Sequence, residues 1–361
     1  MTERELRNLV VEWDLGDANE SPQVASRFQA LLQKLTWFGE TQWSTYLPSE
    51  QAGEDPHYLS RLARWIGNVP GEKSRQLLLE YATCITFFSH ADFHALHLAA
   101  FRGPITRWVV EQTKLGLADP QFQQKLSDEL RALTWYCPVT DSFDINEFHH
   151  LNHLSGVQHR PAFATLAMLD TRGGVASAGQ TTDELVRNLK QYIAKPSKHP
   201  RARPLKRLVL LEDFVGSGSQ AADPIAWALH KLDIPVLFVP LVICCTGLEA
   251  LRQLEESSQG RLKVSPLVTV RPEDVLGPVR QPQIGIPNAE EIEALATATF
   301  ARISGAAASE LPHAPYTPFG YRKTGCSFVS YSNTPDNTLP LIHHRPAGGT
   351  WEPLFPRASR I

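Results

Sequence analysis

The sequence has few cysteines, no long apolar run and no excess of positive charge. Five of its 361 residues are cysteines, and no two of them are spaced as CxxC. Cysteines so few and so scattered argue against a disulfide framework and against a zinc ribbon. The longest apolar run, Val236–Cys245, is interrupted by Pro240 and is much shorter than the ~20 residues of a membrane helix. We therefore predict a protein that does not enter a membrane.

The net charge and the first residues bear on the partners of the protein and on its cellular compartment. Its net charge is −3, so it lacks the positive charge that would hold nucleic acid without sequence preference. A nucleic-acid partner would need a local basic patch. Residues Met1–Arg7 are strongly charged and no apolar stretch follows them, which argues against a signal peptide. We expect a cytoplasmic protein.

The pattern of apolar residues separates a helical region from an α/β region. The chain is 42% hydrophobic, which is enough to bury a core, and its length suits two or three folding units. Its first third shows helical spacing, as in Arg27–Phe38. After residue 133, apolar strands alternate with helices, which is typical of a parallel sheet covered on both faces. Strands are predicted at Thr134–Val139, Phe163–Leu169, Arg207–Leu211, Pro235–Cys244 and Leu262–Val270.

The predicted fold class is therefore α/β, with a mainly parallel sheet and an N-terminal helical region. We assign residues 1–133 to the helical region and 134–275 to the α/β core. We expect residues 276–361 to form a C-terminal helix and a tail that complete a ligand site on the α/β core. Within the helical region, a long helical stretch over Gln76–Gln112 is expected to break near Gly103-Pro104.

The most informative segment is Arg207–Gln220, which reads RLVLLEDFVGSGSQ. An apolar strand ends in Glu212 and Asp213, and a loop of small residues leads into a helix. Ligands of open α/β sheets bind at this end of the strands. The loop Gly216–Ser219 lets backbone N–H groups converge at a helix start, where an anion such as phosphate is favoured. The alternative is a glycine-rich turn that binds nothing.

The same segment resembles the signature of type I phosphoribosyltransferases. It lacks the lysine of the ATPase P-loop and the spacing of GxGxxG. The resemblance implies that Glu212 and Asp213 contact ribose hydroxyls. It also implies that the 5-phosphate is held by Gly216, Ser217, Gly218 and Ser219. Two residues depart from the family pattern, namely Phe214 and Gly216 itself.

The resemblance extends to a second anion site and to a cofactor. In that family the turn after an early strand holds pyrophosphate, and Asp170–Gly174 lies in the corresponding place, with Arg172 as its charged contact. Magnesium is expected only together with a pyrophosphate ligand, whose oxygens would hold it. The family's flexible hairpin before the signature strand is absent, because only the short basic segment Lys195–Lys206 is available. That segment is either solvated or guides an anionic ligand.

Further segments resemble a divergent bacterial branch of this fold that works in conflict and antiphage systems, including retron operons. They are Phe101–Trp108, Thr134–Ser142, Ser332–Leu341 and Trp351–Arg357. The resemblance implies that Asn333, Asp336 and Asn337 form a polar lid over the phosphate site. The alternative is a surface turn stabilised by asparagine and aspartate.

Other polar groups allow two interpretations each. Thr140-Asp141-Ser142 follows a strand and either caps the next helix or joins the site. The histidines of two segments share helical faces, which indicates either buried packing or a metal. They are His90, His94 and His97 in one segment, and His149 and His153 in the other. No cysteine or carboxylate set completes a metal site, so no metal ligand is predicted.

Three functions are compatible with these features. The first is an effector enzyme of antiphage defence, a toxin that binds a phosphoribosyl or nucleotide ligand and transfers or cleaves its glycosidic bond. The second is a non-catalytic module that senses a nucleotide and signals to a protein partner in a defence complex, and the missing hairpin favours it. The third is an interaction subunit of a complex with a reverse transcriptase and nucleic acid.

Overall fold

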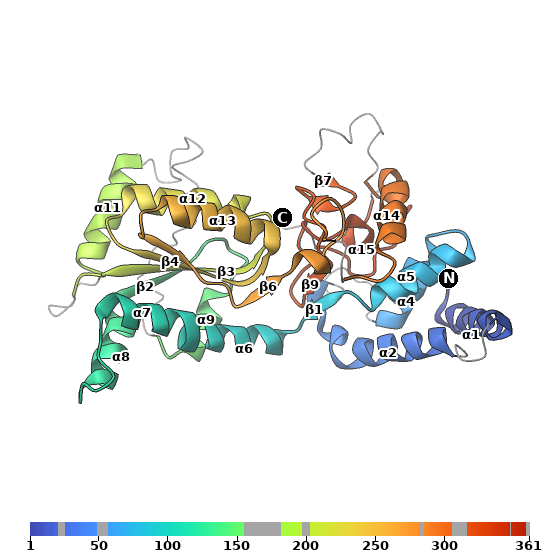
Figure 1. The fold of residues 1–361 in the computed structure, drawn as a ribbon, viewed down its shortest axis with the longest axis horizontal. Coiled ribbons are helices and arrows are strands. Elements are labelled where there is room, and N and C mark those ends of the chain that lie inside the picture. The colour runs from blue at the N-terminus through green and yellow to red at the C-terminus, as the bar shows by residue number, and fades with distance from the viewer. Residues whose placement is uncertain are drawn as a thin grey trace. The chain divides into compact units, whose positions relative to one another are not determined.

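The computed structural model describes residues 1–20, 26–48, 57–154, 182–196, 203–281, 285–304, 316–346 and 348–358. The chain divides into two compact units (Figure 1). Unit 1 comprises Met1–Ala91 and Val270–Ile361, and unit 2 comprises Asp92–Thr269. The predicted strand Phe163–Leu169 and the turn Asp170–Gly174 with Arg172 lie outside the described residues.

Unit 2 is built on a parallel sheet, as the sequence predicted. Strands β2, β3, β4 and β5 pair in that order and run parallel, and β6 also pairs with β4. The bounds are β2 Thr134–Pro138, β3 Arg207–Val215, β4 Val236–Cys244, β5 Leu262–Val264 and β6 Val268–Val270. Every residue of β4 is buried. Such unbroken apolar strands are typical of a sheet that is covered on both faces.

Helices cover both faces of this sheet (Figure 1). One face carries α11 Thr182–Ala194, α12 Ser219–Lys231 and α13 Cys245–Ser257, whose apolar side chains pack on Leu208, Leu210 and Phe238. On the other face Tyr136 packs its ring against Phe101 and Phe148. The helices on that side are α6 His90–Ala100, the π-helix η3 Phe101–Ile105, α7 Thr106–Thr113, α8 Phe122–Ala132 and α9 Ile145–Leu151.

Unit 1 joins the N-terminal helices to the C-terminal tail. Its longer helices are α1 Glu3–Glu20, α2 Arg27–Thr41, α4 Tyr58–Gly67, α5 Glu72–Ala82 and α14 Ala289–Ser304. Its short elements are η2 Trp43–Thr45, η5 Pro272–Asp274, α15 Pro340–His343 and the strands β1 Thr86–Phe88, β7 Tyr316–Thr317, β8 Gly320–Tyr321 and β9 Phe328–Ser330. The indole of Trp65 in α4 donates to the carbonyl of Leu341 at 2.7 Å, which fastens the tail to the helices.

The predicted long helix over Gln76–Gln112 has a different structure. Strand β1 interrupts it and pairs in parallel with β9, a contact that local spacing does not reveal. At Gly103-Pro104 the α-helix is interrupted as expected, but the chain stays helical, because the π-helix η3 carries it through Pro104 into α7. A π-turn suits proline, whose nitrogen has no proton to donate to the helix ladder.

No helix in the described ranges combines the length and the apolar character required to span a bilayer.

Candidate ligand site at the carboxyl end of the parallel sheet

The glycine-serine loop, Gly216–Ser219, leads from the end of β3 into the first residue of α12. Gly218 has φ +80°, a conformation that favours glycine, and α12 begins at the next residue. The hydroxyls of Ser217 and Ser219 lie 3.0 Å apart, and both side chains are half-buried. The first N–H groups of a helix have no partner within that helix. The loop therefore has the local geometry that the sequence predicted for an anion seat.

The start of α13 packs directly against this loop. A Cβ added to Gly247 would lie 2.5 Å from the carbonyl oxygen of Gly216, so only glycine fits there. The hydroxyl of Thr246 donates to the same oxygen at 3.3 Å. Sequence reasoning missed both residues, although they follow β4, the parallel neighbour of β3. Because the carboxyl ends of parallel neighbours meet at one edge, the residues after β4 were a usable signal.

The two acidic residues at the end of β3 have different environments. The Glu212 side chain is 4% exposed, whereas Asp213 is half-buried. Glu212 accepts a hydrogen bond from the backbone N–H of Thr140 at 2.9 Å and one from its hydroxyl at 2.5 Å. Asp213 accepts from the hydroxyl of Ser142 at 2.8 Å and from the N–H of Phe214 at 2.8 Å. The more accessible carboxylate is therefore Asp213.

Burial changes the acidity of Glu212. Burial, and then the neighbouring Asp213 carboxylate, raise the pKa of Glu212 to about 8, against the opposing hydrogen bonds from Thr140 and Ser142. A carboxyl in a site of low polarity holds its proton because the charged form is poorly solvated. Strongly shifted acids are common at functional sites, though not confined to them.

The segment Thr140–Ser142 belongs to this acidic pair and does not cap α9. The cap of α9 is Asp144, whose carboxylate accepts from the N–H of Glu147 at 2.9 Å. Strand β2 pairs with β3 up to Pro138, opposite Leu211. The loop after β2 is thereby placed beside the acidic pair. Of the two interpretations open from the sequence, the structure supports the one in which these residues join the site.

The predicted lid residues have structural partners within unit 1. Asn333 holds the C-terminal tail, because its side chain donates to the carbonyl of Ala358 and accepts from its N–H, both at 3.1 Å. Asp336 lies 3.5 Å from Arg357. Buried Asn337 donates to the hydroxyl of Thr324 at 2.9 Å. These contacts account for the local turn, and a role in ligand binding stays a prediction.

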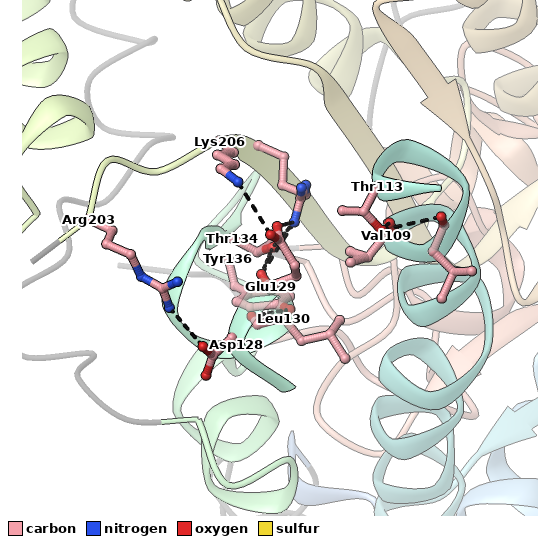
Figure 2. A network of polar contacts seen from close by, with 11 residues as sticks. Val109, Thr113, Asp128, Glu129, Leu130, Thr134, Tyr136, Arg203 and Lys206 are labelled. Atoms are coloured by element: carbon pink, nitrogen blue, oxygen red, sulfur yellow. Dashed lines mark hydrogen bonds and ion pairs between the residues drawn. The ribbon is translucent and has the colours of Figure 1, made fainter. Parts of the chain in front are cut away.

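The described part of the basic segment lies at the opposite end of β3 from the loop. Arg203 and Lys206 point toward α8, where they pair with Asp128 and Glu129 at 3.2 and 3.3 Å (Figure 2). The first residue of β3, Arg207, pairs with Glu129 at 2.8 Å. A strand of this length spans about 26 Å. Arg203 and Lys206 are therefore occupied at the far end of the sheet.

The histidine clusters are explained by packing and by one acidic residue. His94 and His97 each lie 3.6 Å from the carboxylate of Glu147, and the His97 ring packs on Phe143. Helix α9 ends at Leu151, so His153 lies beyond the helix that carries buried His149. Throughout the described ranges, no group of three or more histidine, cysteine or acidic residues is placed to hold a metal ion.

A comparison with known protein families gives one match. The family model PRTase-CE matches residues 62–357, which is most of the chain and includes the acidic pair, the glycine-serine loop and the loop after β2. No curated protein and no solved structure matches the chain.

Proposed function

The chain belongs to the PRTase-CE family of phosphoribosyltransferase-like proteins, and from this premise we propose that it binds a phosphoribosyl or nucleotide ligand at the end of β3. The observation that supports this most is the joint position of three features on one sheet edge. They are the half-buried Asp213, the glycine-serine loop and the start of α12. They offer a carboxylate for sugar hydroxyls and N–H donors for phosphate.

In this proposal the loop supplies most of the affinity. Hydrogen bonds to a charged group contribute about 1.5–3 kcal/mol each, so a few N–H and hydroxyl donors suffice for a phosphate. Asp213 would orient the pentose by accepting from its hydroxyls. Magnesium would enter with a pyrophosphate ligand and be held by the oxygens of that ligand. Arg172 is proposed as a further pyrophosphate contact, on the resemblance alone.

We propose that the ligand's glycosidic bond is broken there, with the phosphoribosyl group passing to an acceptor or to water, and that the protein acts as an effector of antiphage defence. Breaking such a bond makes the sugar carbon cationic. Its stabilisation depends on position and on nearby negative charge, which Asp213 would provide. The defence role rests on the resemblance to bacterial conflict proteins.

One observation favours a second candidate, a non-catalytic nucleotide sensor within a defence complex. Helix α11 ends at Ala194 and β3 begins at Arg207. The N–H of Leu205 donates to the carbonyl of Ile193 at 2.8 Å, so the chain is back at the end of the helix twelve residues later. The resemblance implies a flexible hairpin that closes over the reacting carbon, and only the short segment Lys195–Lys206 is available for it. The same site would then bind a nucleotide without turning it over.

A binding and turnover experiment tests both candidates. Calorimetric titration with phosphoribosyl pyrophosphate and magnesium, NAD or nucleotides should give saturable binding. Asp213→Asn should weaken that binding about ten- to hundredfold, the equivalent of one charged hydrogen bond. Asp233→Asn is the matched control, because Asp233 is exposed beyond the far end of α12.

Mass analysis of the same mixtures separates the enzyme from the sensor. A released base or a new nucleotide, absent with Asp213→Asn, supports the enzyme, whereas binding without product supports the sensor. If none of these compounds binds the wild-type protein, the proposed function is wrong. Protection of cells against phage by the wild-type gene, lost with Asp213→Asn, would support the defence role.

A further inference from the structure

Four side-chain oxygens connect the two acidic residues of β3 through three short contacts, and Oγ of Ser142 also lies at the longer distance of 3.3 Å from Oε1 of Glu212. The Oε1 atom of Glu212 lies 2.5 Å from Oγ1 of Thr140, which lies 2.6 Å from Oγ of Ser142. The Ser142 oxygen in turn lies 2.8 Å from Oδ1 of Asp213. All three separations are those of O–H···O hydrogen bonds. We name Glu212, Thr140, Ser142 and Asp213 the four-residue chain.

The four-residue chain needs one more proton than its two hydroxyls can supply. Three hydrogen bonds require three protons, and Thr140 and Ser142 carry one each. If both carboxyls were ionised, Thr140 would donate to Glu212 and Ser142 to Asp213. The 2.6 Å contact between the two hydroxyl oxygens would then contain no proton. A proton on one carboxyl fills all three contacts.

We infer that Glu212 and Asp213 share a single proton through the hydroxyls of Thr140 and Ser142, so that the acidic pair carries one negative charge. With the proton on Glu212, that carboxyl donates to Thr140, Thr140 to Ser142, and Ser142 to the Asp213 carboxylate. With the proton on Asp213, every bond in the chain reverses. Either end can hold the proton without breaking a hydrogen bond.

Transfer along the chain is balanced in protons and charge. The Glu212 proton passes to the Thr140 oxygen while the Thr140 proton passes to the Ser142 oxygen. The Ser142 proton passes in turn to Oδ1 of Asp213. Both hydroxyls remain neutral, Glu212 becomes the carboxylate, and Asp213 becomes the neutral acid. The buried end is thus a proton store for the more accessible end.

The surroundings of Glu212 favour this arrangement. On its own strand the adjacent charged group is Asp213, and like charges disfavour a second ionisation. From the loop after β2 it contacts the uncharged Thr140 and Ser142, with exposed Asp141 between them. On β4 the residue opposite it is Pro240, which has no charge. Burial raises the pKa of Glu212 to about 8, which agrees with a proton retained at neutral pH.

This inference rests on its own geometry, and its consequence for the ligand rests on the proposed function. A pair of ionised carboxylates would repel the phosphate that the neighbouring loop is proposed to bind. A shared proton halves that charge. The site would therefore bind anionic phosphopentoses while the proton is present.

Infrared difference spectroscopy of the protein without ligand tests the shared proton. At pH 7 the wild-type protein should show the carbonyl stretch of a neutral carboxylic acid, absent in Glu212→Gln. The band should disappear as the pH rises through about 8. If both carboxyls are ionised at pH 7, the band is missing and the inference fails. The outcome does not depend on ligand binding, so the proposed function can fail separately.

The Ser142→Ala variant separates a shared proton from a proton held by burial alone. In the four-residue chain, Ser142 links the neutral acid to the Asp213 carboxylate, so its loss should lower the midpoint of the band by about one pH unit or more. If Ser142 merely donates to ionised Glu212, its loss should raise the midpoint. A raised or unchanged midpoint would overturn the inference.

Variants of Thr140 repeat this test at the second hydroxyl. Thr140→Val should lower the midpoint, and Thr140→Ser, which keeps the hydroxyl, should restore the wild-type value. A midpoint that is indifferent to the Thr140 hydroxyl would contradict the sharing. Ser257→Ala, an exposed position late in α13, is the control and should leave the band and its midpoint unchanged. Circular dichroism confirms that each variant is folded.

Discussion

Strand β3 has buried charged residues at both ends, and the two ends hold them in different ways. At its start, Arg207 is paired with Glu129 of α8, with side-chain exposures of 5% and 16%. At its end, Glu212 and Asp213 are both acids and are held by hydroxyls and N–H groups. Opposite charges that satisfy each other hold a structure together. Two acids held side by side cost stability when both are ionised, and such pairs are common at functional sites.

The two ends of β3 also differ in what they can bind. Figure 2 shows the polar contacts near the start of β3, where Arg203 pairs with Asp128 and Lys206 pairs with Glu129. Its cations are already partnered. At the other end, the loop after β3 is built from small residues and packs on Gly247. The first end ties α8 to the sheet, and the second brings backbone N–H groups to an edge.

The largest expected effect is on stability, from breaking the pair at the start of β3. Arg207→Met leaves the Glu129 carboxylate without its closest cation in a largely buried place, which should lower the free energy of unfolding by about 3–5 kcal/mol. Arg203→Met, on the same network but half-exposed, should cost about 0–1 kcal/mol. Urea unfolding of both variants measures the difference. Equal losses would mean that burial of the pair does not matter.

The next effect is a pH dependence at the other end of the strand. The pKa of Glu212 is raised to about 8 from an ordinary 4.5, so the folded state binds this proton more tightly than the unfolded state. The stabilisation is fully present below the unfolded pKa and is lost as the pH rises toward about 8. Glu212→Gln cannot titrate, so its stability should fall less than that of the wild type between these limits. Parallel slopes in urea unfolding would contradict the raised pKa.

A smaller effect tests whether the loop is a ligand seat or an ordinary turn. Gly218 and Gly260 both have φ +80°, but an added Cβ at Gly260 meets nothing within 4 Å. Each glycine-to-alanine change should cost about 1–2 kcal/mol of stability from the strained backbone. Gly218→Ala should also weaken binding of the phosphoribosyl ligand, whereas Gly260→Ala should not. Calorimetry on both variants decides, and equal affinities would argue for the turn that binds nothing.

The smallest effect concerns the support that α13 gives to the loop. Thr246→Val removes the hydroxyl that donates to the Gly216 carbonyl at 3.3 Å, while keeping the shape of the side chain. The expected cost is about 0.5–1.5 kcal/mol of stability, with a modest loss of ligand affinity. Thr297→Val, which removes an exposed hydroxyl that bonds within α14, is the matched control. If Thr297→Val lost more stability than Thr246→Val, the support that Thr246 gives to the loop would be unimportant.

Features that depend on local patterns could be predicted from the residues alone. Unbroken apolar runs predicted β3 and β4 and the parallel sheet, because strands buried on both faces have no polar alternation. The glycine-serine loop was predicted from its small residues between an apolar strand and a helix, and Gly218 has the left-handed conformation that favours glycine. The cap of α9 at Asp144 is also a local feature, because a carboxylate three residues before Glu147 can accept its N–H.

Contacts between residues far apart in the chain depend on strand order and packing, which local patterns do not reveal. Strand β1 pairs with β9, more than two hundred residues later in the chain, so no local spacing could predict it. Thr140 reaches Glu212 across 72 residues because β2 is the neighbour of β3 in the sheet. The count of protons between the acidic pair depends on three oxygen–oxygen distances of 2.5, 2.6 and 2.8 Å. Strand order and packing fix such distances, and the residue types alone do not.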